Sequence, residues 1–199
     1  AQSGKAGGGL FTTLIEQSAK GEGGGTGNAI VGPAIMTIFA SIIGLPIGIG
    51  AGVYLAELGG NWFGKITRFI ADTLIGVPSI IVGIFIYTLV VLPMGTQSGL
   101  PGALWLAMIM IPIVSRTTEE MIRLVPQPMR EAALALGAPQ WRVTWNIVLP
   151  AAASAIATGA MLAIARITGE TAPLLFTALN SRIYNYFLDQ PMASLTLQI

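Results

Sequence analysis

The chain has 199 residues, of which 53% are hydrophobic and 10% are charged, and its mean hydropathy is +0.74. These values exceed those of ordinary soluble domains, so the composition predicts an integral membrane protein. A net charge of +1 without a basic stripe argues against nucleic acid as a partner. With no histidine and no cysteine, metal or haem ligation by those side chains and thiol chemistry are excluded.

The first 28 residues are rich in glycine and serine, and the run GEGGGTG is typical of a flexible connector. We expect this connector, residues 1–28, to lie outside the cytoplasm. No initiator methionine or signal-peptide pattern stands at its start, so we expect the chain to begin within a longer protein. Residues 29–199 are expected to form one transmembrane domain.

Four apolar runs predict four membrane-spanning helices, because a span needs about 20 mainly apolar residues. They cover residues 29–56, 66–92, 100–114 and 147 to about 179. The stretch GVPS (Gly76–Ser79) interrupts the second run, and a charged segment extends the third beyond Val114. The expected fold class is therefore all-α, a polytopic transmembrane helical bundle.

Two side-chain patterns within these spans predict how the helices pack. Gly44, Gly48 and Gly52 lie at four-residue spacing on one helix face, which lets another helix approach closely. Asp72 in the second span is expected to pair with Arg68, one turn earlier.

Positive charges near the span ends predict the orientation, since cytoplasmic loops carry an excess of Lys and Arg. One side holds Lys65, Arg68, Arg123, Arg130 and Arg142. The other side holds Lys5, Lys20 and Arg182. We expect the first side to face the cytoplasm, together with the segment of residues 126–148 between the third and fourth spans.

This cytoplasmic segment predicts a helix–turn–helix along the membrane surface. Gly137 stands where a first helix would end, and Pro139 stands where a second would begin. Trp141 and Trp145, four residues apart, share a face of the second helix and suit the membrane interface. Two interpretations follow: a docking surface for a soluble partner, or a hairpin that only anchors two spans.

A sequence motif in the segment favours the docking surface. The pattern Glu-Ala-Ala, three residues, Gly, nine residues, Ile-x-Leu-Pro resembles the EAA loop of ABC-importer permeases. It matches without a gap at Glu131, Ala132, Ala133, Gly137, Ile147, Leu149 and Pro150. The resemblance implies the type I, MetI-like permease fold and a coupling helix that docks on a cytosolic ATPase.

Three further stretches resemble the permease subunit of the bacterial phosphate-specific importer, the PstA type: PIVSRTTEEMIRLVP, AIARITGETAPLLFTA and PSIIVGIFIYTLVV. The resemblance runs from about Gly7 to Ile199. It implies a multi-pass subunit of the bacterial inner membrane with six spans, so that one span at each end is expected to be missing here. The implied partners, besides membrane lipid, are cytosolic ATP-binding subunits, a second related permease and a periplasmic phosphate-binding protein.

Arg166 and Glu170, one turn apart, are the first candidates for the substrate pathway. Arg166 lies roughly 24 Å along its helix from Pro150, well inside the bilayer, where an ionisable residue indicates function. A guanidinium offers phosphate a planar fork of donors and stays charged. Arg116, followed by Glu119 and Glu120, is a further candidate nearer the cytoplasm. For both arginines the alternative is an ion pair that only fixes helix packing.

The sequence leaves other functions open. No GxxxxGK[ST] phosphate loop occurs, so we expect no enzyme activity and no cofactor bound by this chain, with ATP and Mg²⁺ used by a partner ATPase. The same fold also suits sulfate or molybdate. A secondary transporter independent of ATP would need its own coupling residues. A membrane enzyme is a remote alternative without histidine, cysteine or paired carboxylates at the surface.

Overall fold

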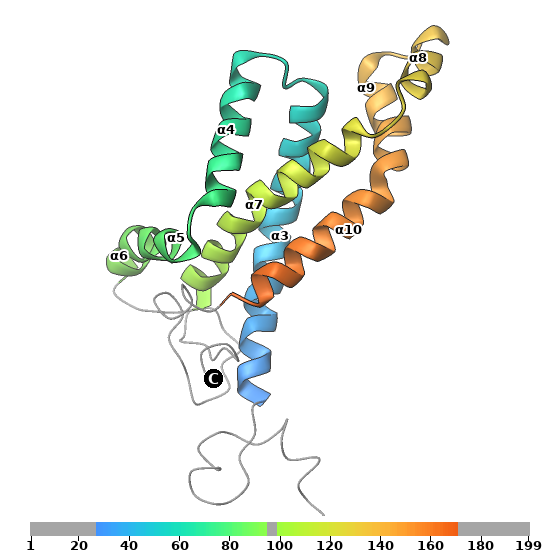
Figure 1. Ribbon diagram of the computed structural model, residues 1–199. Coiled ribbons are helices and arrows are strands. Elements are labelled where there is room, and N and C mark those ends of the chain that lie inside the picture. Colours follow the sequence, from blue (N-terminus) through green and yellow to red (C-terminus); the bar gives the residue numbers. More distant parts are fainter. Residues whose placement is uncertain (1–26, 95–98, 171–199) are drawn as a thin grey trace, which may run out of the picture. The chain divides into compact units, whose positions relative to one another are not determined.

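A computed structural model describes residues 27–94 and 99–170 of the chain. Every regular element in these residues is a helix, as Figure 1 shows, which confirms the all-α fold class. The predictions for residues 1–26 and for those after 170, including Lys5, Lys20 and Arg182, lie outside the described residues. The elements are α3 (Gly27–Glu57), α4 (Trp62–Gly76), α5 (Ser79–Ile86), η1 (Tyr87–Val91), α6 (Leu92–Met94), α7 (Gly99–Arg123), α8 (Gln127–Ala135), α9 (Gln140–Val143), η2 (Thr144–Val148) and α10 (Leu149–Thr168).

Several of these helices suit a membrane. Two are long and apolar enough to cross it, at Pro33–Glu57 and Gln140–Thr168, and α4 with α5 makes a third candidate if the broken pair counts as one span. The second of these begins before the predicted Ile147, because α9, η2 and α10 follow one another without a break. The third predicted span corresponds to α7, which is not among these candidates and continues as one helix through the charged segment to Arg123.

The break between α4 and α5 lies at Val77 and Pro78, where the sequence predicts it. Val77 has an extended backbone, with φ −71° and ψ 132°. Proline forces this conformation, because its ring disfavours the helical conformation of the residue before it. Proline also has no N–H with which to continue the helical hydrogen bonds. The interruption by GVPS is therefore confirmed.

The chain divides into two compact units. The first contains the described parts of residues 1–40, 78–107 and 167–199, and it buries Trp105 and Leu106. The second contains residues 41–77 and 108–166, and all the charged clusters described below belong to it.

Within the second unit, α3 packs closely on α7 through the predicted glycine row. A Cβ atom added to Gly44 or Gly48 would lie 2.8 Å from the side chains of Met110 or Val114 respectively. At Gly52 the added atom would lie 2.5 Å from Thr118 Cβ and 2.6 Å from a backbone oxygen. No side chain fits in such a space, so the glycines are what allow the two helices to approach. The close-approach prediction is confirmed.

An apolar cluster supports the segment of residues 126–148. It is formed by the end of α7, by α8, α9 and η2, and by the start of α10. Its buried members are Ile122, Val125, Ala133, Val143, Val148, Ala152 and Ile156. Burial of these side chains fixes the position of the segment relative to α7 and α10.

Candidate functional site: a charged pocket and the α8–α9 segment

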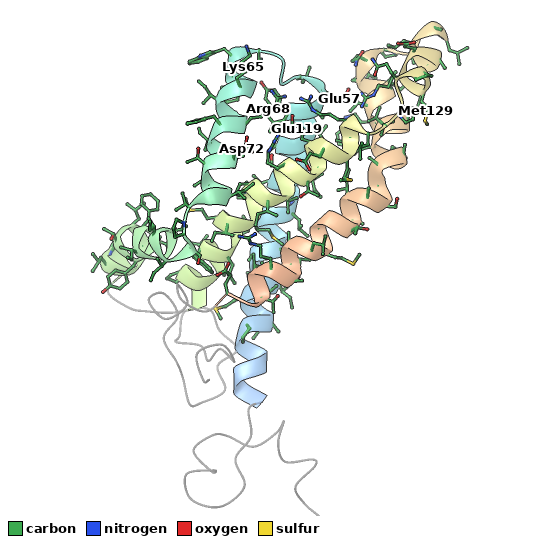
Figure 2. The ribbon with its side chains drawn as sticks, in the orientation of Figure 1. Glu57, Lys65, Arg68, Asp72, Glu119 and Met129 are labelled. Carbon is green, nitrogen blue, oxygen red and sulfur yellow. The ribbon has the colours of Figure 1, made fainter. Side chains whose placement is uncertain are left out.

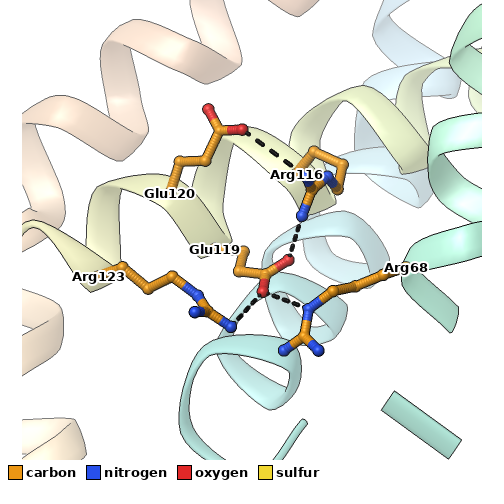
Figure 3. A pocket seen from close by; sticks show the side chains of 5 residues that line it. All are labelled: Arg68, Arg116, Glu119, Glu120 and Arg123. Atoms are coloured by element: carbon orange, nitrogen blue, oxygen red, sulfur yellow. Dashed lines mark hydrogen bonds and ion pairs between the residues drawn. The ribbon is translucent and has the colours of Figure 1, made fainter. Parts of the chain in front are cut away.

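Glu119 of α7 is the centre of a charged cluster in the second unit. Its side chain is 1% exposed and contacts three arginines, as Figure 3 shows. Arg116 and Arg123 lie one turn before and one turn after it on α7, with N–O distances of 2.7 and 2.8 Å. Arg68 reaches the same carboxylate from α4 with its Nε at 2.6 Å. A buried carboxylate keeps its charge only with such partners, so Glu119 joins α4 to α7.

Asp72 does not pair with Arg68, and that prediction was wrong. Its Oδ1 lies 2.7 Å from Nε of Arg116 instead. Arg68 donates its two remaining groups to the carbonyl oxygens of Leu55 and Gly59, near the end of α3, at 2.7 and 2.9 Å. A pair within one helix is worth only a few tenths of a kcal/mol, whereas Arg68 here satisfies a buried carboxylate and helix-end carbonyls.

The predicted set around Arg116 does come together. Glu119 accepts a hydrogen bond from it, and Glu120 lies 4.0 Å away. These residues line an open pocket of about 360 Å³, with Arg68, Arg116 and Arg123 facing Glu119 and Glu120. With Asp72 paired to Arg116, the three arginines of this cluster are balanced by three carboxylates. The described residues contain no group of three His, Cys, Asp or Glu suited to a metal ion.

Arg166 is placed differently, in the last turn of α10. Its side chain is exposed, it does not line the pocket, and it forms no salt bridge with another described residue. Glu170 lies beyond the end of α10 and is half-buried, with its backbone N–H donating to Ile167. The pairing of Arg166 with Glu170 stays a prediction.

The segment of residues 126–148, which we call the α8–α9 segment, has the predicted helix–turn–helix form. α8 ends at Ala135, and Gly137 has a φ of 81°, a conformation that side chains disfavour and glycine adopts freely. Pro139 then caps α9. Of the motif residues in α8, Ala133 is buried, whereas Glu131 and Ala132 are exposed. Leu136 is 90% exposed, so the outer face of the segment is open to a partner.

Sequence reasoning missed one polar contact beneath this segment. Arg130 of α8 donates a hydrogen bond to Glu57 at the end of α3, and Thr144 of η2 lies 3.1 Å from the other oxygen of Glu57. Figure 2 shows Glu57 at the end of the second unit where Lys65 and Arg68 also lie. The two charges stand 73 residues apart, so no local pattern could have paired them.

Comparison with known families identifies the chain. The family described as "Binding-protein-dependent transport system inner membrane component" matches residues 44–195. The chain belongs to this family. It is a multi-pass protein of the bacterial inner membrane, in agreement with its candidate spans.

Curated relatives of the chain are phosphate transport system permease proteins PstA, which confirms the resemblance to that type. One from Yersinia pestis is 52% identical over 178 residues, covering 89% of this chain and 60% of the relative. One from Haemophilus influenzae is 49% identical over 193 residues, covering 96% of this chain and 68% of the relative. The chain thus spans less than two thirds of the first of these relatives.

The fold also has a match among solved structures. A structure described as "Inward facing conformations of the MetNI methionine ABC transporter" matches with a TM-score of 0.63 at 21% identity. The match covers 74% of this chain and 71% of that chain. This likeness confirms the type I, MetI-like permease fold expected from the motif.

Proposed function

We propose that this chain is part of the permease subunit of an ATP-driven importer of inorganic phosphate. The observation that carries the proposal is the identity of about half of its residues to PstA phosphate permeases, over most of its length. The exposed α8–α9 segment with its EAA motif supports coupling to an ATPase. The chain itself then performs no chemistry and binds no cofactor, and the ATPase partner uses ATP and Mg²⁺.

Three protein partners follow from this proposal. Cytosolic ATP-binding subunits dock on α8 through Glu131 and Ala132, and on the exposed Leu136 that follows it. A second, related permease subunit completes the translocation path beside this chain. A periplasmic phosphate-binding protein delivers the anion to the outer face. ATP binding closes the ATPase pair and shifts the permease from one access state to the other.

The path for phosphate involves Arg166, and Glu170 is a further candidate for the path. Arg166 lies deep along the helix that leaves the α8–α9 segment, and its exposed guanidinium has a fork of donors suited to an oxyanion. Arg116 is a second candidate at the cytoplasmic end of the path, where it lines the charged pocket but shares its donors with Asp72 and Glu119. Brief contacts suit a conduit, because tight binding would delay release.

The test is uptake of labelled phosphate at low external concentration, in cells that lack the full-length subunit and in cells with it restored. Phosphate import predicts that restored uptake requires ATP and resists competition by excess sulfate or molybdate. Competition by sulfate or molybdate would indicate that the importer carries another oxyanion instead. Uptake that persists on ATP depletion and follows membrane potential would support a secondary transporter and contradict the proposal.

A further inference from the structure

Helix α8 is held to the second unit by few side chains. Of its nine residues, Gln127–Ala135, Ala133 is buried and Arg130 is half-buried, and the other seven are exposed. Ala133 presents only a methyl group to the apolar cluster. A methyl contact resists separation but is non-directional, so it transmits little sideways displacement. Arg130 is therefore the main directional contact of α8.

The contacts of Arg130 reach two other helices. Its Nη1 donates to Glu57, the last residue of α3, and its Nη2 donates to the carbonyl oxygen of Ile122 on α7 at 2.9 Å. The Arg130 and Glu57 side chains are 15% and 6% exposed. The second oxygen of Glu57 is 3.1 Å from the Thr144 hydroxyl. We call these residues, Glu57, Arg130 and Thr144, the α8 node.

The helices that meet at the α8 node are themselves closely packed on each other. The row Gly44, Gly48 and Gly52 brings α3 against α7, with no space for a single methyl group between them. Glu119, the centre of the charged pocket, lies one turn before Ile122 on α7. A displacement of α8 passed to Glu57 and Ile122 is thus passed to the helix that carries the pocket.

We propose that Arg130 is a positioning residue that transmits movement of the ATPase-docking helix α8 to α3 and α7 through Glu57. The inference rests on the proposed function, and it assigns to Arg130 a role distinct from contact with the ATPase. The pair stays formed while α8 moves, because separating it would leave two buried, unpaired charges. Closure of the ATPase therefore moves α8, the end of α3 and the end of α7 together.

The first test uses the complete transporter in proteoliposomes and measures phosphate transported per ATP hydrolysed. Glu57→Gln and Arg130→Gln each lower this ratio by about 5- to 150-fold, the usual range for a coupling between sites. The double variant loses no more than the larger single loss, because both changes break one interaction. Thr144→Val removes only a hydroxyl and gives a smaller loss in the same direction. The matched control is Lys65→Gln, which removes an exposed cation at the same end of the unit.

Additive losses in the double variant, or an equal loss in Lys65→Gln, would overturn the inference. If the Gln variants fail to assemble, an unchanged ratio in Thr144→Val also overturns it. Failure of the proposed function reads differently, because the wild-type transporter would then move no phosphate.

A second measurement does not depend on the cargo. The chain has no cysteine, so in an otherwise cysteine-free transporter spin labels can be attached through Leu58→Cys after α3 and Met129→Cys in α8. With the α8 node intact, ATP leaves the distance between the labels unchanged. In Arg130→Gln, ATP lengthens or broadens that distance. An unchanged distance in this variant contradicts the inference, whatever the transported anion.

Discussion

Two arginines of the second unit, Arg116 on α7 and Arg166 on α10, have very different surroundings. Arg116 is held by Asp72 and Glu119 at 2.7 Å each and lies 4.0 Å from Glu120. Arg166 is exposed and forms no salt bridge with another described residue. The charge of Arg116 is therefore neutralised by neighbouring carboxylates, whereas the charge of Arg166 is not, within the described residues.

The difference assigns a different role to each arginine. A guanidinium fixed by two helices holds those helices together, and its donors are occupied by carboxylates. A guanidinium without such partners keeps its planar fork for an anion or for a neighbouring subunit. We therefore expect loss of Arg116 to affect stability first, and loss of Arg166 to affect transport first.

The largest effect on stability is expected from a change at Glu119. This residue is the centre of the charged cluster that holds Arg116, which we call the Arg116 cluster. Glu119→Gln leaves three arginines around a neutral group, and losing one partner of a buried pair costs about 3–5 kcal/mol of unfolding free energy. The control is Glu120→Gln, whose side chain is 61% exposed and whose change costs less than about 1 kcal/mol. Apparent melting temperatures of the assembled transporter in detergent check this. Equal melting temperatures of the two variants would contradict a structural role for the cluster.

A smaller loss of stability is expected when a substitution displaces α7 without changing a charged residue. Gly52→Ala places a methyl group 2.6 Å from the Ser115 carbonyl oxygen, and such overpacking costs about 1–3 kcal/mol. Gly50→Ala is the matched control, because its added atom meets nothing within 4 Å. The same melting measurement distinguishes them. If Gly52→Ala is as stable as Gly50→Ala, the close contact of α3 with α7 does not support the Arg116 cluster.

The smallest effect on stability, about 1–2 kcal/mol, is expected at the turn after α8, which contains neither arginine. Gly137 has a φ of 81°, and a β-branched side chain is strained in that conformation. Gly137→Val thus displaces α8 and lowers the phosphate transported per ATP hydrolysed, while the control Gly60→Val, where an added Cβ meets nothing within 4 Å, does not. If Gly137→Val transports as much phosphate per ATP as the wild type, the docking role of the α8–α9 segment is contradicted.

Local signals in the sequence predicted the features that depend on neighbours in the chain. The break at Pro78, the turn at Gly137 and the glycine row from Gly44 to Gly52 each follow from one residue type in one position. The EAA motif also indicated the segment that is exposed in the structure.

The pairs between distant residues could not be predicted in this way. Asp72 pairs with Arg116 rather than with Arg68, and Glu57 pairs with Arg130 across 73 residues. Such pairs depend on the rotation and register of each helix against the next, and one sequence does not determine either. The charge of Arg130 had suggested only the orientation in the membrane.

The most direct measurement compares Arg166→Gln with Arg116→Gln in the complete transporter, recording both ATP-dependent phosphate uptake and melting temperature. Losing a charge-assisted contact of about 1.5–3 kcal/mol corresponds to roughly a 10- to 150-fold loss of uptake. The predicted result is this loss in Arg166→Gln with unchanged melting, and a lowered melting temperature in Arg116→Gln. The contradicting result is the reverse: normal uptake with lowered melting in Arg166→Gln, and lost uptake with unchanged melting in Arg116→Gln.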